Sequence, residues 1–249
     1  METKLRVEIL PQPDDFTCGP TCLHALYRYF GDELPLEQVI GEVPVLENGG
    51  TLDVLLANHA LARDYKARIF TYNVQMFDPT WFDGRAVDIS ERLRLQLEHK
   101  DSGRLRVATR AYLRFLKKGG ELRFEELTTA LIRKYLGREI PILTGLSATY
   151  LYRNAREFGP EGRADDIRGR PAGHFVVLCG YDRETRDVLV ADPLLKNPLS
   201  GTNYYVVSID RVIGAILLGI LTYDANFLII QPRPGRKLQK RRADSHRRQ

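Results

Sequence analysis

The sequence has few cysteines and no long hydrophobic run. Three cysteines in 249 residues are too few, and odd in number, for a disulfide framework, which favours a reducing compartment. The most apolar segment, residues 212–221, is about half as long as a transmembrane helix. The charged start, METKLRVEIL, lacks the apolar core of a signal peptide. We therefore expect a cytoplasmic protein without a membrane span.

Acidic residues are scarce only at the C-terminal end. The formal net charge is +5, but residues 231–249 hold eight basic residues and one acidic residue. The remainder has 29 basic and 31 acidic residues. We predict a basic, flexible tail at 232–249. Such a tail binds an acidic partner or nucleic acid, or it only aids solubility. It has no aromatic residues for base stacking, which argues against sequence-specific recognition.

The whole chain has an ordinary globular composition, with 43% hydrophobic and 28% charged residues. Helical patterns come first and strand patterns follow, an order that indicates an α+β fold. We predict one domain at 1–231, with an enlarged helical region at about 74–139. The predicted helices after the first are 34–43, 51–65, 88–100, 105–120 and 123–137, with Thr51 as a cap, and the predicted strands are 66–73, 140–147, 174–182, 187–193, 204–209 and 226–232.

The stretch PQPDDFTCGPTCLHALYRYFG, residues 11–31, places Cys18 between a polar turn and an apolar helix. Thr17 is a candidate N-cap, Pro20 fits the first helical turn, and Gly31 ends the pattern. Cys18 therefore lies at the helix N-terminus, where the helix dipole favours the thiolate, the reactive form of cysteine. A purely structural cysteine remains the alternative for this stretch alone. The buried face is predicted from the spacing of Cys22, Leu23, Leu26, Tyr27 and Phe30.

A predicted hairpin around the turn DRETRD brings a histidine near a carboxylate. Pairing residues whose numbers sum to 366 or 367 places His174 opposite Asp192 or its neighbour, at the open end of the hairpin. Asp192 would orient the imidazole, and His174 would act as base and then as acid. Gln12, six residues before Cys18, could donate to an oxyanion together with the Cys18 N–H.

These motifs resemble the C39 and C39-like cysteine peptidases of the papain-like superfamily. The resemblance rests on Gln12, on Cys18-Gly19-Pro20 opening a helix, and on GHFVVLCGYD followed by VLVADP. It implies a papain-like fold with Cys18 as nucleophile, His174 as base, Asp192 as orienter and Gln12 as oxyanion donor. It also implies a peptide or isopeptide substrate and no cofactor or metal. Many transporter-linked relatives carry an acidic residue where this chain has Thr17.

Three other interpretations use some of the same residues. Acyl transfer to an amine, as in phytochelatin synthase, needs the same catalytic set, and a catalytically silent binding module would keep only the fold. A metal site would use Cys18, Cys22 and His24, but the second ligand pair that zinc motifs need is missing. The polar segment 152–173 is either a solvated loop or a flap beside the site.

Overall fold

The computed structural model describes residues 2–47, 49–84, 87–100 and 102–235. The predicted basic tail, residues 232–249, lies outside these residues except for 232–235. Within the described chain, no helix combines the length and the apolar character needed to cross a bilayer.

One mixed sheet forms the centre of the molecule. Its strand order is β3-β2-β10-β4-β7-β8-β9, and β1 pairs with β7. The pairs are antiparallel except for the parallel pair β2–β3. The sheet strands are β1 (Thr3–Lys4), β2 (Tyr65–Thr71), β3 (Glu121–Arg123), β4 (Ile142–Ser147), β7 (Gly173–Asp182), β8 (Asp187–Ala191), β9 (Tyr204–Ser208) and β10 (Asn226–Pro232).

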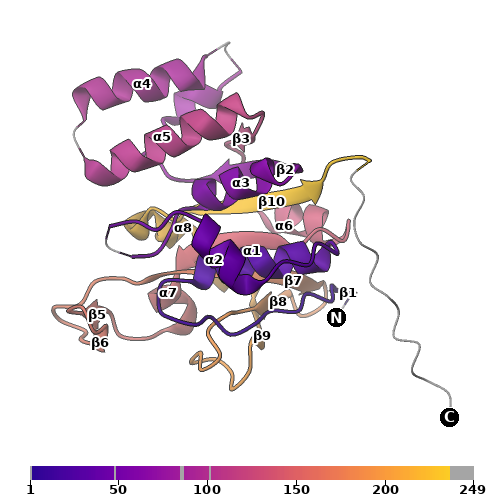
Figure 1. Ribbon diagram of the computed structural model, residues 1–249. Helices are drawn as coiled ribbons and strands as arrows, with labels where there is room; N and C mark the ends of the chain where they lie inside the picture. Colours follow the sequence, from indigo (N-terminus) through magenta and orange to yellow (C-terminus); the bar gives the residue numbers. More distant parts are fainter. Residues whose placement is uncertain (1, 48, 85–86, 101, 236–249) are drawn as a thin grey trace.

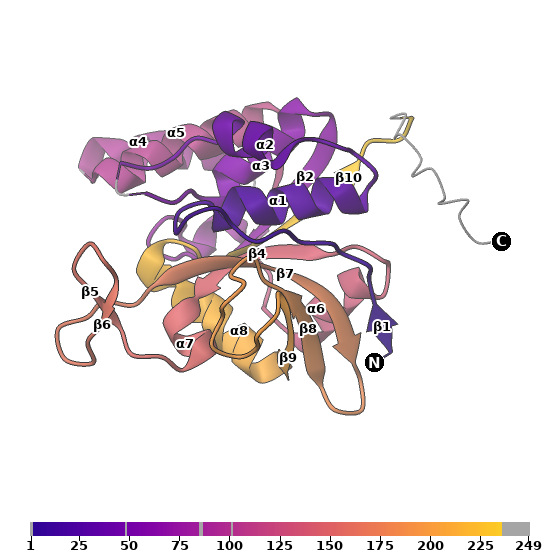
Figure 2. The same ribbon diagram turned by 60° about the horizontal axis from the view of Figure 1, so that its bottom comes forward.

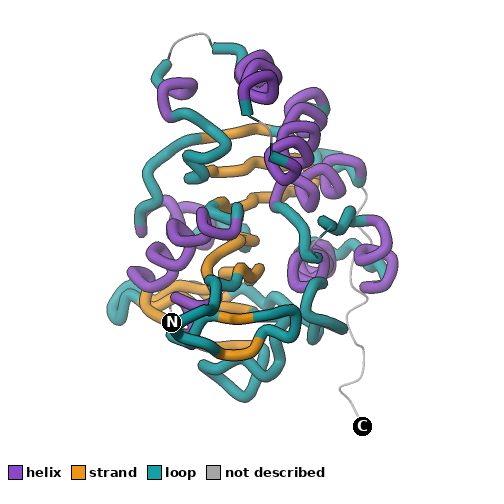
Figure 3. Tube along the Cα trace, turned by 90° about the vertical axis from the view of Figure 1, so that its left-hand side faces the viewer, coloured by secondary structure: helices purple, strands orange, loops and turns teal. Residues whose placement is uncertain are grey.

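Helices cover both faces of this sheet. Figure 2 shows α1 to α5 on one face and α6 to α8 on the other, and Figure 3 shows the strands stacked between helices on both sides. The α+β class predicted from the sequence is confirmed. The helices are α1 (Cys18–Tyr29), α2 (Leu36–Glu42), α3 (Asp53–Ala62), α4 (Ile89–His99), α5 (Gly103–Lys117), α6 (Thr129–Leu136), α7 (Ala148–Tyr152) and α8 (Ile209–Leu218), with 3-10 turns η1 (Pro79–Phe82) and η2 (Gly219–Thr222).

Two local predictions about helix starts are wrong. The helix predicted over 123–137 begins only at Thr129, because residues 121–123 pair with β2 as strand β3. Thr51 does not cap α3, since its hydroxyl donates to the carbonyl oxygen of Pro44, 3.0 Å away. The sequence patterns also missed α7, β1 and the two-residue strands β5 (Glu157–Phe158) and β6 (Arg163–Ala164).

The predicted register of the β7–β8 hairpin is off by about two residues. Asp182 pairs with Asp187 at the turn, and Val177 pairs with Ala191 beyond an irregularity between Leu178 and Gly180. Paired numbers therefore sum to 369 and then 368 rather than 366 or 367. The bulge changes the register within the hairpin, so Asp192 continues the strand diagonally across from His174 instead of directly opposite.

The segment predicted as a loop or flap contains the small β5–β6 hairpin. Figure 2 shows this hairpin projecting from the body of the molecule, beside the end of α7. Most of its residues are exposed, and the guanidinium of Arg168 lies 4.3 Å from the centre of the Phe158 ring. The hairpin returns to the sheet at Gly173, the first residue of β7.

Candidate active site

Cys18 is the first residue of α1 and is almost covered, with 8% of its surface exposed. The N-terminus of α1 sits tightly against its neighbours, because a Cβ on Gly19 would come within 2.7 Å of the Thr51 side chain. Thr17 occupies the predicted N-cap position, but it makes no side-chain capping bond. Its hydroxyl donates to the Asp14 carbonyl oxygen instead. The first helical N–H groups are thus left without that partner.

His174, at the start of β7, lies between Cys18 and Asp192. Its Nε2 atom is 2.8 Å from Oδ1 of Asp192, and the nearby Cys18 side chain also interacts with the ring. Burial alone would lower the pKa of His174. The Asp192 carboxylate, the hydrogen bond with Asp192 and the nearby Cys18 side chain outweigh burial and raise this pKa to about 10. The imidazole is therefore held as a cation near neutral pH.

Asp192 is completely buried and receives four hydrogen bonds. Oδ1 accepts from Nε2 of His174 and from the backbone N–H of Leu194, at 2.8 Å each. Oδ2 accepts from the hydroxyls of Tyr152, at 2.6 Å, and Tyr205, at 2.8 Å. Burial opposes ionisation, but the His174 charge and these donors lower the pKa of Asp192. The site therefore contains a buried ion pair whose carboxylate is fully hydrogen-bonded.

Sequence reasoning missed Tyr152 and Tyr205. Tyr152 ends α7, a helix the patterns did not predict, and Tyr205 points inward from β9. The burial of β9 alternates, with Tyr205 and Val207 inside, so strand periodicity could have marked Tyr205 as an inward residue. No sequence signal connects either tyrosine to Asp192, because 40 and 13 residues separate them from it.

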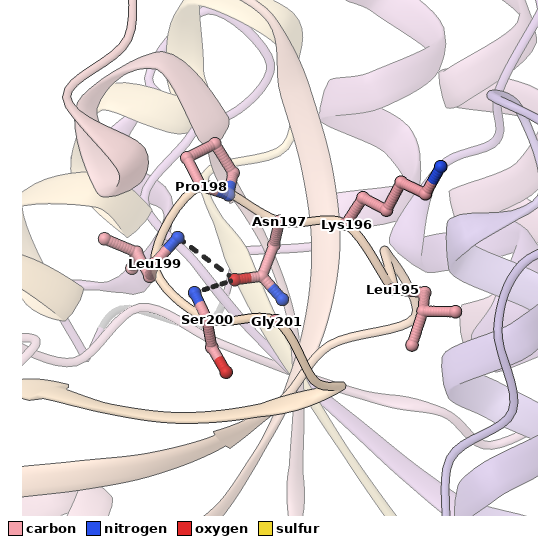
Figure 4. A pocket seen from close by; sticks show the side chains of 7 residues that line it. All are labelled: Leu195, Lys196, Asn197, Pro198, Leu199, Ser200 and Gly201. Atoms are coloured by element: carbon pink, nitrogen blue, oxygen red, sulfur yellow. Dashed lines mark hydrogen bonds between the residues drawn. The ribbon is translucent and has the colours of Figure 1, made fainter.

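The loop after Asp192 is held by asparagine side chains. Asn203 brackets Asp192, donating from Nδ2 to its carbonyl oxygen and accepting its N–H through the backbone. Asn197 accepts from the N–H groups of Leu199 and Ser200 (Figure 4). Its Nδ2 donates to the carbonyl oxygens of Leu194 and Thr202. Residues 195–201 surround a pocket of about 620 Å³ within this one loop. The loop thereby fixes the backbone on the C-terminal side of Asp192.

Gln12 lies in the turn before α1 and is tied to the same loop. Its backbone N–H donates to the carbonyl oxygen of Pro193, 2.9 Å away, which places it beside the end of β8. Its side-chain Nε2 donates to the Asp14 carbonyl oxygen at 2.8 Å. The amide thus bonds its own turn, and its role toward an oxyanion stays a prediction.

The remaining candidate ligands have other partners. The thiol of Cys22 donates to the carbonyl oxygen of Phe175 at 3.3 Å, and burial followed by the nearby Cys18 raises its pKa. Nε2 of His24 lies 2.9 Å from the Leu34 carbonyl oxygen. Within the residues that the structure describes, no three potential ligands gather as a metal site would require. Cys22 packs in the core, as the helix pattern predicted.

The base of the β5–β6 hairpin approaches the same site. Burial, and then the carboxylate of Asp15, raise the pKa of Glu157, whereas the His174 charge lowers it. Glu157 is therefore within electrostatic reach of both the turn before Cys18 and the imidazole. This position favours the flap interpretation of segment 152–173 over that of a remote solvated loop.

Residues 108–208 match the sequence model of the Peptidase_C39 like family. The predicted resemblance to C39-like peptidases is confirmed. The match includes His174 and Asp192 and begins well after Gln12 and Cys18. The family similarity therefore concerns residues 108–208, the part of the chain that contains the candidate histidine and aspartate. No curated protein matches the chain in sequence.

One solved structure of low identity shares the fold of this chain, and two others align with it at lower TM-scores. A Bacillus anthracis protein described as C39-like is 13% identical, and the alignment covers 93% of this chain and 98% of that one with a TM-score of 0.50. The peptidase domain of Streptococcus ComA is 13% identical over 92% of this chain and 100% of that one, with a TM-score of 0.45. Xylellain, a cysteine protease from Xylella fastidiosa, is 13% identical, and the alignment covers 92% of this chain and 85% of that one with a TM-score of 0.42. Location in the cytoplasm stays a prediction.

Proposed function

We propose that this chain is a thiol hydrolase that cleaves a peptide or isopeptide amide with Cys18, His174 and Asp192. The observation that carries this proposal is the placement of His174, whose Nε2 is held by Asp192 while the Cys18 side chain lies close enough to influence the ring. A cation beside the sulfur, together with the start of α1, stabilises a thiolate. Asp192 in turn fixes the orientation of the imidazole.

The proposed reaction proceeds through an acyl-enzyme. The Cys18 thiolate attacks the amide carbonyl carbon, forming a C–S bond and an oxyanion. The C–N bond then breaks, and the His174 imidazolium gives its proton to the departing amine. His174, now neutral, removes a proton from water as the water attacks the thioester. The products are an acid and an amine, and the thiolate–imidazolium pair is restored.

The oxyanion would be bound at the N-terminus of α1. The backbone N–H of Cys18 is one donor, since the first N–H groups of a helix have no intrahelical partner. Gln12 is the second proposed donor. Its amide bonds the carbonyl oxygen of Asp14, so this role requires a rotation of its side chain toward the sulfur when substrate binds.

The first test is alkylation of Cys18 by iodoacetamide from pH 4 to 9, followed by mass spectrometry. His174, with a pKa of about 10, stays protonated throughout this range, so the label reports a thiolate beside an imidazolium. We expect rapid labelling of Cys18 at pH 5–6 and at least about tenfold slower labelling in His174→Ala. Cys22 and Cys179 are internal controls, because burial raises the pKa of both thiols.

His24→Ala is the matched control, since it removes a histidine whose ring bonds the Leu34 carbonyl oxygen. It should leave the labelling rate of Cys18 unchanged. If Cys18 of the wild type labels no faster than an ordinary thiol with a midpoint near pH 8.5, the proposed pair is not assembled. The chain would then be a binding module with the same fold. If labelling is fast, a search of a peptide library for cleaved amides follows.

A further inference from the structure

Helices α4 and α5 form an antiparallel pair that packs on α3 at the edge of the molecule (Figure 1). Residues 103–118, which include α5, contain no acidic residue. Their basic side chains are all exposed. The charge is therefore concentrated on one helix, although the chain without its tail is nearly neutral. These residues are Arg104, Arg106, Arg110, Arg114, Lys117 and Lys118.

A groove of about 940 Å³ lies between the start of α4 and the end of α5. Arg94 contributes from α4, and Arg114, Lys117 and Lys118 contribute from α5 and its C-terminus. Two half-buried leucines, Leu113 and Leu116, supply apolar surface between these cations. The groove thus combines positive charge with an apolar floor.

The cations of the groove have no acidic partner in the described part of the chain. No ion pair within 4 Å joins Arg94, Arg114, Lys117 or Lys118 to a described carboxylate. Asp88 also lines the groove, but its Oδ1 accepts the N–H groups of Ser90 and Glu91 as the cap of α4. Asp88 offsets one of the four positive charges, so the groove keeps a net positive charge, which attracts an anionic ligand.

The apolar floor decides between two anionic polymers. Nucleic acids bind through phosphate contacts and through stacking of bases on aromatic rings, and the described groove lining has no aromatic side chain. Leucines beside cations instead complement a peptide that carries both carboxylates and apolar side chains. An acidic peptide segment is the occupant that fits both properties.

Helix α5 connects the groove to the neighbourhood of the candidate active site. The α5 helix begins near it, because the Arg104 guanidinium lies 5.4 Å from the centre of the Tyr223 ring, and Tyr223 precedes Asp224, a buried acid that interacts with His174. Ten residues of helix separate Arg104 from Arg114, a span of about 15 Å. Helix α5 therefore runs from the neighbourhood of Asp224 to the groove.

We propose that the groove between α4 and α5 is an exosite that binds an acidic, leucine-containing segment of the peptide substrate. This inference rests on the proposed function, because only a hydrolase has a peptide substrate. The binding of the peptide itself does not depend on catalysis. The segment would lie outside the scissile bond, and its charges would pair with Arg114, Lys117 and Lys118. Specificity would then come from a surface separate from the catalytic residues.

The test is the binding of a fluorescent peptide of about 12 residues, composed of Glu and Leu, to the full-length Cys18→Ala protein at about 0.1 M salt. Fluorescence anisotropy gives Kd. We expect the triple variant Arg114→Glu, Lys117→Glu, Lys118→Glu to raise Kd at least about tenfold. The matched control reverses three exposed cations elsewhere, Lys66, Arg138 and Arg183, and should change Kd less than about twofold. Both variants keep the basic tail.

Three outcomes would overturn the proposal. Equal losses in the two triple variants would mean attraction by the overall charge or by the tail. Equal affinity for a peptide of the same charge composed of Glu and Ser would show that the leucines of the peptide do not contribute to binding. Tighter binding of a single-stranded oligonucleotide, lost in the groove variant, would make the site a nucleic-acid surface. Because the tested protein lacks the Cys18 thiol, none of these results depends on whether the chain is a hydrolase.

Discussion

Two buried carboxylate sites near His174 differ in charge although both are removed from water. Asp192 has a lowered pKa, whereas burial raises the pKa of Asp224 to about 7. Burial also raises the pKa of Asp53, and the nearby Asp224 carboxyl raises it further. Asp192 has a cationic imidazole and four hydrogen-bond donors. Asp53 instead has the nearby Asp224 carboxyl, and the charges of Arg104 and His174 only partly offset the burial of Asp224.

The difference shows that the neighbour's charge and the available donors decide ionisation once burial is equal. Asp53 accepts from the side-chain amide of Asn226, and the Thr222 side chain favours ionisation of Asp224. These interactions do not offset the desolvation of either carboxyl. Asp224 also lies so close to Gly173 that a Cβ there would be 2.5 Å from its Oδ2. The close approach of the Asp224 carboxyl thus requires a glycine before His174.

The largest expected effect comes from breaking the charged site. Asp192→Ala leaves the imidazolium of His174 and the hydroxyls of Tyr152 and Tyr205 buried without their acceptor. We expect a loss of about 3–5 kcal/mol in the free energy of unfolding, measured with urea at pH 7. Asp210→Ala is the control, since it removes only an exposed pair with Arg186 and should cost less than about 1 kcal/mol. Similar losses of unfolding free energy in both variants would contradict a special role of the buried ion pair between Asp192 and His174.

Replacing Asp224 is expected to increase the free energy of unfolding by an amount that depends on pH. The folded pKa of Asp224, about 7, lies above its unfolded value near 3.9, so the carboxyl favours folding below pH 4 and loses this contribution as the pH rises through 7. Asp224→Asn has no carboxyl to ionise, so it does not lose this stability as the pH rises. Its unfolding free energy relative to wild type should therefore rise by about 4 kcal/mol from pH 4 to pH 8.

Urea unfolding at several pH values measures this difference directly. Asp166→Asn, an exposed residue in the β5–β6 segment, provides the control and should show no comparable pH dependence. A constant difference between Asp224→Asn and wild type from pH 4 to pH 8 would mean that Asp224 is ionised in the folded protein. The two buried sites would then not differ in charge.

The smallest expected effects separate the hydroxyls around the two sites. Tyr152→Phe and Tyr205→Phe each remove one donor to Asp192 and should cost about 1–2 kcal/mol of unfolding free energy. Tyr112 is buried near Asp53 and Asp224, but the described residues supply no hydrogen-bond partner for its hydroxyl. Tyr112→Phe should therefore cost less than about 0.5 kcal/mol. Thermal or urea unfolding of the three variants makes the comparison.

Local patterns predicted most secondary structure because they depend on nearby residues. The spacing of apolar residues identified α1, and Gly31, at φ 78°, ends it as expected. The failures come from longer-range effects. Pairing with β2 converts residues 121–123 into a strand, and the bulge near Cys179 shifts the hairpin register. Neither depends on the local propensity of those residues.

The sequence alone determined that Cys18 opens a helix, that His174 begins a strand and that Asp192 follows the next one. These positions are fixed by turn residues and by periodicity within short segments. Only the tertiary structure decided which charges the buried groups carry, because Tyr152, Tyr205 and the pair of Asp53 and Asp224 come together from distant segments. The groove between α4 and α5 also depends on the tertiary structure, since its walls form only when the two helices pack side by side. The protonation of a buried side chain and the binding of a ligand depend on residues that are close in space. These residues are far apart in the sequence, so local patterns do not identify them.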